Sequence, residues 1–247
     1  MDVVRGGAGT IVVMPTYQEA DNIGVTLPRL LACCPEVDVL VVDDDSPDGT
    51  GALAEDMAGR NPHVHVLHRH ARRGLGPAYV QGFRWSLEQG YDLICEMDMD
   101  GSHRPQDLAR MLAVARGHTH PGLVIGSRRV RGGRTQDWPW YRDLISRAGS
   151  WYARTALGSS VRDMTAGLRV YRADVLRRID LGRVRSSGYV FQVDMLRRVQ
   201  AMGVSVVEVP IVFVERVRGS SKMDAGIVLE AMVQVTLWGL ERLTRRN

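Results

Sequence analysis

Apolar, β-branched runs alternate with helix-period segments through the first half of the chain, and this alternation constrains the fold most. Runs such as TIVVMP and VLVVD are typical of buried strands. The segments between them place apolar residues three or four positions apart, as in helices that cover a sheet. We expect strands at 10–15, 37–43, 63–67, 93–98 and 123–127, and helices at 19–31, 50–60, 75–88 and 105–116. The pattern predicts an α/β protein with a mostly parallel central sheet.

The second half of the chain is less regular. We expect a loop at 128–141, helices at 143–157 and 189–201, and a strand at 204–214 that contains Pro210. An amphipathic helix is expected at 226–242. No repeat or linker divides the chain, and 247 residues suit one α/β domain, so we expect a single domain over 1–247.

Charge and cysteine content narrow the class of protein. The net charge is +4 and the pI about 9.2, which fits anionic ligands, whereas no nucleic-acid-binding motif is present. The three cysteines include an adjacent pair, which indicates a reducing cytoplasm rather than a disulfide framework. The N-terminus lacks a signal-peptide core, and no uncharged apolar stretch reaches about 18 residues. Any membrane contact is therefore expected to be peripheral.

The segment MDMDGSH carries the strongest chemical signal. Asp98 and Asp100 follow an apolar strand, at the edge of a parallel sheet where ligands bind. Two nearby carboxylates repel each other unless a cation lies between them, and Mg²⁺ or Mn²⁺ shares its remaining positions with water and phosphate oxygens. The pattern favours a metal-bound diphosphate. The alternative is a polar turn in which Ser102 caps the helix at 105–116.

Two other loops follow strands. In VVDDDSPDGT, Asp43 and Asp44 need hydrogen-bond donors, which the N–H edge of a nucleobase would supply. The alternative is a turn in which Asp48 caps the next helix. In PTYQEADNI, Tyr17 suits stacking on a base and Glu19 suits accepting hydrogen bonds. An ordinary strand-to-helix loop explains that segment equally well.

Basic residues without obvious carboxylate partners stand at Arg128, Arg142, Arg216 and Lys222. Arg216 and Lys222 flank a glycine-serine loop, which suits closure over a departing pyrophosphate, although each is also explained as a solvated surface charge. The segment RRGLGPAYVQG is a plausible anion cradle. It is not a dinucleotide fingerprint, because Tyr79 occupies a glycine position.

Aromatic and basic residues gather at Trp138, Trp140 and Trp151. Such a mixture suits a membrane interface, and a packed core patch is the alternative. The last helix is apolar over much of its surface and ends in arginines, which favours membrane contact over simple packing.

Four histidines, in two pairs spaced by two residues (63 and 65, 68 and 70), resemble a metal cluster. Nearby carboxylates for a zinc site are missing from the local sequence, so we expect surface histidines instead.

A family resemblance follows from motifs that run from residue 15 to 223. In chain order they are PTYQEADNI, VVDDDSPDGT, RGLGPAYVQGF, EMDMDGSHRP, GSRR, YRDLIS, DMTAGLRVYR, SSGYVFQVDM and VPIVFVERVRGSSKM. The chain resembles dolichyl- or polyprenyl-phosphate mannosyltransferases, and more narrowly their polyprenol-monophosphomannose synthase branch. These are inverting glycosyltransferases with the GT-A (Rossmann-like) nucleotide-sugar transferase fold.

The resemblance implies roles for the matching positions. The nucleotide-sugar would be bound by Pro15, Tyr17, Glu19, Val42, Asp44, Asp98, Met99, Asp100, Arg216 and Lys222. The metal would be held by Asp98, Asp100 and Ser102. The acceptor phosphate would be bound by Arg128, Arg142 and Ser146. The catalytic group would comprise Asp98, Asp100, Arg128, Arg216 and Lys222.

The resemblance also implies a reaction and a place in the cell. Mannose would pass from GDP-α-mannose to a polyprenyl phosphate with inversion, aided by Mg²⁺ or Mn²⁺, at the cytoplasmic face of the membrane. A membrane-protein partner is possible. Residues 10–127 would form a nucleotide-binding half, 128–225 the acceptor side and a mobile loop, and 226–247 the terminal amphipathic helix.

Some positions depart from the family pattern and leave alternatives open. Arg129 stands where the family usually has Tyr, Gln18 where it has Asn, Leu168 where it has an aromatic residue, and Ser102 where some relatives have Gln. A UDP-glucose-dependent transferase acting on the same lipid, an enzyme glycosylating a natural product and a non-catalytic nucleotide-sugar-binding protein remain as alternatives.

Overall fold

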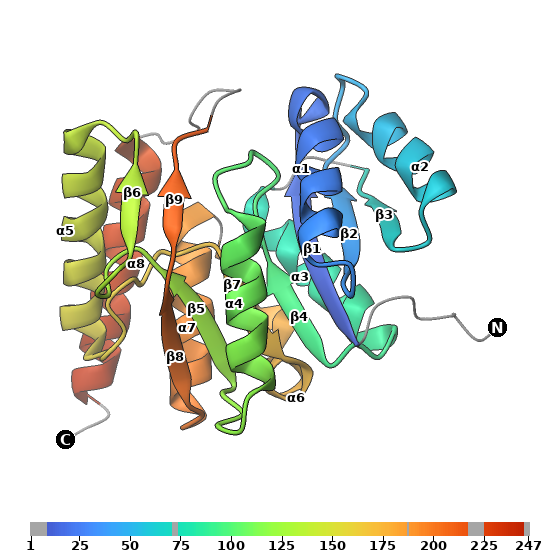
Figure 1. Cartoon of the computed structure of the whole chain (residues 1–247). Helices are drawn as coiled ribbons and strands as arrows, with labels where there is room; N and C mark the ends of the chain where they lie inside the picture. The colour runs from blue at the N-terminus through green and yellow to red at the C-terminus, as the bar shows by residue number, and fades with distance from the viewer. Residues whose placement is uncertain (1–8, 71–73, 187, 217–224, 245–247) are drawn as a thin grey trace.

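The central feature of the computed structural model is one seven-stranded sheet with helices on both faces (Figure 1). The structure describes residues 9–70, 74–186, 188–216 and 225–244. The sheet has the order β3-β2-β1-β4-β7-β5-β8. Its strands are β1 Thr10–Thr16, β2 Asp38–Asp43, β3 Val64–His68, β4 Leu93–Glu96, β5 Leu123–Ser127, β7 Arg169–Arg172 and β8 Val206–Pro210. A separate two-stranded sheet pairs β6 Arg134–Gln136 with β9 Val212–Val214.

Helices connect these strands in the order that the sequence pattern predicts for the first half. They are α1 Ala20–Cys33, α2 Thr50–Arg60, α3 Leu75–Glu88, α4 Pro105–Arg116, α5 Trp140–Leu157, α6 Ala173–Arg177, α7 Gly188–Ala201 and α8 Ala225–Thr244, with a short 3₁₀ turn at Leu181–Arg183. The predicted bounds of α2, α3, α4 and β5 agree with the structure.

Strand direction places the loops that matter on one edge. β1 pairs in parallel with β2 and β4, β2 pairs in parallel with β3, and β5 pairs in parallel with β8. Only β7 of the main sheet is antiparallel to its neighbours, β4 and β5. The mostly parallel sheet is thus confirmed, and the carboxyl ends of β1, β2, β4 and β5 share one edge.

The core lies in two layers, one on each face of the sheet. Side chains alternate along β1, so that Ile11 and Val13 belong to one buried cluster and Val12 and Met14 to the other. Helix α3 approaches β1 closely: a Cβ added at Gly82 would lie 2.4 Å from a methyl carbon of Val13. The absence of a side chain at Gly82 therefore lets the helix reach the sheet.

The second half departs from the sequence prediction in two places. The predicted strand at 204–214 is two strands, because β8 ends at Pro210 and β9 leaves the main sheet to pair with β6. The predicted loop at 128–141 contains β6. Strand β7 was not predicted.

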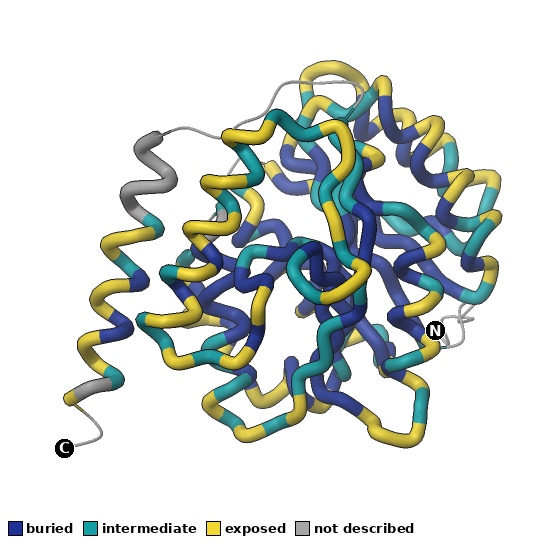
Figure 2. Tube along the Cα trace, turned by 60° about the vertical axis from the view of Figure 1, so that its left-hand side comes forward, coloured by how far each residue is buried: buried dark blue, intermediate teal, exposed yellow. Residues whose placement is uncertain are grey.

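Helices α5 and α8 lie side by side beyond the β8 end of the sheet (Figure 1). The hydroxyl groups of Tyr152 and Thr236 are 2.5 Å apart, and the guanidinium carbon of Arg197 lies 4.6 Å from the ring centre of Trp238. Figure 2 shows that the outer side of α8 is largely exposed. The last helix therefore packs on the domain with one face and presents the other to solvent.

No helix within the described ranges is both long enough and apolar enough to cross a membrane.

Candidate active site

The loops that follow β1 and β2 are tied together by hydrogen bonds. The backbone N–H of Gln18, whose φ is 59°, donates to Ser46 Oγ at 3.1 Å. The N–H groups of Glu19 and Ala20 donate to side chains of the second loop, Thr50 Oγ1 at 2.9 Å and Asp48 Oδ2 at 3.1 Å. This places the predicted nucleotide-binding segments side by side and fixes the entry to α1.

The predicted residues of these loops differ in what they can offer a ligand. Pro15 is directly opposite Val42 in the β1–β2 register, and Tyr17 and Glu19 are half-buried just beyond it. Val42 and Met99 have their side chains in the hydrophobic core, so only their backbone groups are available for binding.

Protein groups supply the hydrogen-bond donors for the consecutive aspartates. Asp44 forms a buried ion pair with Arg69. Asp43 accepts hydrogen bonds from the backbone N–H of Ser46 at 3.3 Å and from the hydroxyl of Thr16 at 3.4 Å. The interpretation that a nucleobase would supply these donors is therefore wrong, because protein groups already do so. Contact of Asp44 with a nucleotide stays a prediction.

The turn after β4 organises its two carboxylates internally. Oδ1 of Asp100 accepts hydrogen bonds from the N–H of Ser102 at 3.0 Å and from its hydroxyl at 2.6 Å. Ser102 does not cap α4, whose N-cap residue is Arg104. The buried His103 ring accepts a hydrogen bond from the N–H of Asp98 at 3.2 Å and lies 3.8 Å from its carboxylate. The turn thus fixes the carboxylate of Asp100 and the backbone of Asp98.

The electrostatics of this turn suit a bound cation. Loss of hydration raises the pKa of the Asp98 carboxyl; His103 and Arg216 oppose that shift, and Asp100 adds to it. A cation would instead stabilise the ionised carboxylate. Among the described residues, no three His, Cys, Asp or Glu side chains gather as a metal site. Asp98 and Asp100 would leave most positions of a hard divalent ion to phosphate oxygens and water, so the donor set fits Mg²⁺ or Mn²⁺.

Arg128 has a buried carboxylate partner, contrary to the sequence prediction. Nε and Nη2 of Arg128 donate to Asp163 at 2.8 and 2.7 Å, and its backbone N–H donates to the same carboxylate at 2.8 Å. Burial acts to raise the pKa of Asp163, but the attraction and hydrogen bonds of Arg128 outweigh it and leave that pKa low. The bidentate pair fixes the plane of the guanidinium group.

The other predicted cations are paired as well. Arg142 donates to both oxygens of Glu215 at 2.7 and 2.8 Å. Arg216 lies 3.3 Å from Asp100 Oδ2, which brings this cation directly to the acidic turn. The prediction of unpaired cations is therefore wrong for all three arginines. Lys222 lies outside the described residues.

Two aromatic rings connect the acidic turn with the arginines. Phe213 on β9 packs edge-on against His103, with ring centres 5.2 Å apart, and against Trp138 at 5.3 Å. The guanidinium of Arg128 lies 5.5 Å from the Phe213 ring centre, and that of Arg142 lies 5.1 Å from the Trp138 ring centre. The predicted diphosphate and acceptor-phosphate residues thus belong to one contiguous cluster.

Ser146 is held by the neighbouring Arg129 rather than by Arg128. Nη2 of Arg129 donates to Ser146 Oγ at 2.9 Å, and its Nη1 donates to Asp143 Oδ1 at 2.6 Å. The residue that departs from the family pattern is therefore adjacent to the predicted acceptor site.

No role is predicted from sequence for Asp163 or Phe213. For Trp138 the sequence leaves a membrane interface and a packed patch open, and its contact with Phe213 shows packing. Asp163 lies in the DMTAGLRVYR motif, where an acid among apolar neighbours signals a buried ion pair. No local signal identifies Phe213, because its partners come from distant segments.

The carboxylate of Asp38 lies beside two of the four histidines, His63 and His65. Nδ1 of His63 is 2.8 Å from Asp38, whose other oxygen accepts a hydrogen bond from Tyr91 at 2.6 Å and lies 3.9 Å from Nε2 of His65. The expectation that carboxylates are missing is wrong, because β2 brings Asp38 beside β3. His63 and His65 are half-buried and hydrogen-bonded, whereas His68 and His70 are exposed, as expected of surface histidines.

Comparison with known proteins identifies the family. The family model described as glycosyl transferase family 2 matches residues 11–180. The chain belongs to glycosyl transferase family 2. It is 56% identical over 230 residues to the undecaprenyl-phosphate mannosyltransferase of Micrococcus luteus, covering 93% of each chain. It is 49% identical over 245 residues to the polyprenol monophosphomannose synthase of Mycolicibacterium smegmatis, covering 98% of this chain and 91% of that one.

Solved structures of low sequence identity share the fold. One is the mannosyltransferase PcManGT of Pyrobaculum calidifontis in complex with GDP-Man and Mn²⁺. Its match has a TM-score of 0.62 at 20% sequence identity and covers 96% of this chain and 64% of that chain. Another is glucosyl-3-phosphoglycerate synthase of Mycobacterium tuberculosis in complex with Mn²⁺, uridine diphosphate and phosphoglyceric acid. Its match has a TM-score of 0.66 at 17% sequence identity and covers 97% of this chain and 79% of that chain. The predicted GT-A fold is confirmed.

Proposed function

We propose that this glycosyltransferase moves mannose from GDP-α-mannose to a polyprenyl phosphate and releases GDP and polyprenyl β-mannosyl phosphate. The observation that carries the proposal is the contiguous cluster at the sheet edge: Asp98 and Asp100 on one side, Arg128 and Arg142 on the other, with Phe213 between them. The names of the two bacterial relatives above support the same donor sugar and acceptor class.

The donor side has to hold a diphosphate and accept the charge that develops as it leaves. Asp98 and Asp100 would hold Mg²⁺ or Mn²⁺, which neutralises the departing GDP when bound. Arg216, 3.3 Å from Asp100, adds a cation at the same place. Lys222, six residues further along the sequence, is proposed to act with it. The segments around Tyr17, Glu19 and Asp44 would surround the nucleoside.

The acceptor side has to orient a phosphate and requires little base catalysis. A phosphate monoester already carries an anionic oxygen near neutral pH, so that oxygen can attack the anomeric carbon without first losing a proton. One bond forms from that oxygen to the anomeric carbon as the bond to the diphosphate breaks, which inverts the centre. Arg128, held in plane by Asp163, and Arg142 would aim the phosphate. Ser146 is proposed to complete the acceptor site.

A lipid acceptor requires the site to reach a membrane, and the surface of α5 and α8 supports this. Exposed large apolar side chains on these helices are Trp140, Tyr141, Leu144, Ile145, Trp151, Met232, Val233, Leu237 and Leu240. Apolar and aromatic side chains on adjacent helices suit the interfacial layer of a bilayer. We therefore propose that the protein binds a membrane peripherally, and the family resemblance implies the cytoplasmic face.

A radiolabel transfer assay tests the proposal. GDP-mannose and UDP-glucose are offered in parallel with a polyprenyl phosphate, with Mg²⁺, Mn²⁺ or EDTA, and label is counted in the organic-extractable lipid. We expect label from GDP-mannose alone, abolished by EDTA. Label from UDP-glucose instead would assign the alternative donor. A protein that binds GDP-mannose but labels no lipid would overturn the proposed acceptor.

A further inference from the structure

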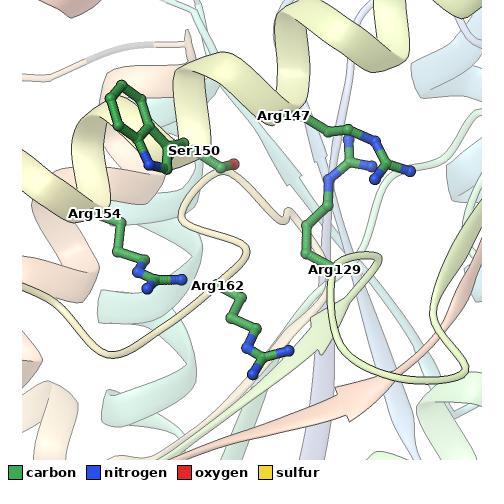
Figure 3. A pocket seen from close by; sticks show the side chains of 6 residues that line it. Arg129, Arg147, Ser150, Arg154 and Arg162 are labelled. Atoms are coloured by element: carbon green, nitrogen blue, oxygen red, sulfur yellow. The ribbon is translucent and has the colours of Figure 1, made fainter.

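A second cationic site lies between α5, the loop after β5 and the segment before β7, beside the acceptor arginines. A cavity of about 200 Å³ is lined by Arg129, Arg147, Ser150, Trp151, Arg154 and Arg162. Figure 3 shows the guanidinium groups of Arg129 and Arg147 close together on one side, with Arg154 and Arg162 on the other. Arg128 and Arg142 do not line this cavity.

The cavity carries an excess of positive charge. Asp143 accepts hydrogen bonds from the side chains of both Arg129 and Arg147 at 2.6 Å, and the backbone N–H of Arg162 donates to Glu208 at 2.8 Å. In the part of the chain that the structure describes, the exposed side chains of Arg154 and Arg162 have no carboxylate partner. Guanidinium groups gathered around one hollow repel one another, and a bound anion would relieve that repulsion.

The same helix face alternates cations with exposed apolar side chains. Trp140, Leu144, Arg147, Trp151 and Arg154 are spaced by four, three, four and three residues, which places them along one side of α5. Trp140 is 77% exposed and Trp151 is 66% exposed. Tryptophan rings rest at the level of lipid headgroups, where arginines reach phosphates. A site for a small soluble anion has no need of such a rim.

We propose that this cavity binds the phosphate of an anionic phospholipid headgroup, as a site separate from that of the acceptor. The inference rests on the proposed membrane-bound function and adds the class of lipid that the surface selects. Occupation of the cavity would set the orientation of α5 on the bilayer and keep the neighbouring Arg129–Ser146 pair at the membrane surface.

Vesicle sedimentation tests the site with a matched pair of variants. Arg154→Glu/Arg162→Glu reverses two cations of the cavity. Arg177→Glu/Arg178→Glu makes the same change of charge on and just after α6. This helix follows the antiparallel strand β7, so it lies at the edge of the sheet where the parallel strands begin. Vesicles of phosphatidylcholine alone are compared with vesicles containing phosphatidylglycerol, and circular dichroism checks that both variants fold.

We expect the cavity variant to lose affinity for phosphatidylglycerol vesicles by about tenfold or more, because each basic side chain near an anionic surface contributes appreciably to binding. The α6 variant should bind nearly as the wild type does. Transfer to a short-chain polyprenyl phosphate in detergent should be unchanged in both. Equal losses in the two variants would overturn the proposal, since general surface charge would then explain binding.

Two further outcomes would also overturn it. Calorimetric binding of inorganic phosphate that depends on the cavity, with vesicle binding unaffected, would assign the site to a free anion. A raised KM for the lipid acceptor in detergent would assign it to the acceptor. A wild type that shows cavity-dependent vesicle binding but transfers no mannose would overturn the proposed function and leave this site standing.

Discussion

The carboxylate of Asp100 meets three partners at once: the N–H and hydroxyl of Ser102 on one oxygen and Arg216 on the other. Asp98 is held by His103 through its backbone. The contacts with Ser102 and His103 join residues close in sequence, whereas the contact between Asp100 and Arg216 joins residues far apart in sequence. The acidic turn is therefore recognisable from MDMDGSH, whereas the arrival of Arg216 depends on the tertiary fold.

Replacement of Asp100 tests the acidic turn. We expect Asp100→Ala to lower turnover by about 100-fold or more, because the stabilisation of the departing diphosphate is lost. The fold should remain, because the side chain lies in the turn after β4 and belongs to neither buried apolar cluster. The exposed Asp174→Ala on α6 serves as the control and should keep wild-type turnover. Near-normal turnover of Asp100→Ala, measured with radiolabelled GDP-mannose, would refute the metal role.

The Arg128–Asp163 pair makes a prediction about stability. Asp163→Asn leaves a buried guanidinium without its carboxylate, and we expect a loss of about 3–5 kcal/mol in the free energy of unfolding. Urea denaturation of the two proteins at neutral pH measures it. A difference below about 1 kcal/mol would show that the pair is not buried as described.

The same pair predicts a pH dependence. The pKa of Asp163 is lowered in the folded protein, so the unfolded chain binds the proton first as the pH falls. The contribution of the pair is present above the ordinary carboxyl pKa of about 3.9 and is lost as the pH drops below it towards the lowered value. In acid titrations followed by circular dichroism, Asp163→Asn should lose less stability than the wild type across that range.

Among the secondary-structure elements, local sequence predicts the first half well and the second half less well. Strands β1 to β5 and helices α1 to α4 carry strong apolar periods, and their predicted bounds differ little from those observed. The short strand β7 (RVYR) has polar ends and was missed, because its place between β4 and β5 depends on pairing with both. The same holds for β6, whose pairing with β9 joins segments far apart in the chain.

The contact between α3 and β1 predicts a stability change. In Gly82→Ala the new Cβ would lie 2.4 Å from a methyl carbon of Val13, so we expect a loss of about 1–3 kcal/mol through overpacking. Gly59→Ala is the matched control on α2, where nothing lies within 4 Å, and it should gain about 0.5–1 kcal/mol. Thermal unfolding measures both. Stabilisation by both substitutions would contradict the close approach of α3.

The segment after β9 is predicted to assist the leaving group. Lys222→Ala should lower kcat more than it weakens donor binding, because the cation is needed most when charge develops on the departing diphosphate. Arg216, at the start of this segment, already reaches Asp100. Steady-state kinetics with GDP-mannose provides the test, and a rise in KM with unchanged kcat would exclude this role.

Across the whole molecule, the site is assembled from loops that meet only in the folded chain. Most of the predicted site residues that the structure describes lie at or just beyond the carboxyl end of a strand, as the rule for parallel sheets requires, whereas Arg142 and Ser146 lie on α5. Their carboxylate partners Asp163 and Glu215 and the bridging Phe213 were not predicted, because they come from β9 and from the segment before β7. Family resemblance supplied the roles, and tertiary structure supplied the partners.

The choice of acceptor tests the central claim most directly, namely that one cluster joins a diphosphate site to a site for an anionic lipid phosphate. The measurement is the rate of label transfer from GDP-mannose to polyprenyl phosphate and, in parallel, to the unphosphorylated polyprenol of the same chain length. We predict transfer to the phosphate alone, because the arginines recognise a negative charge that the alcohol lacks. Comparable rates with both lipids would contradict the account.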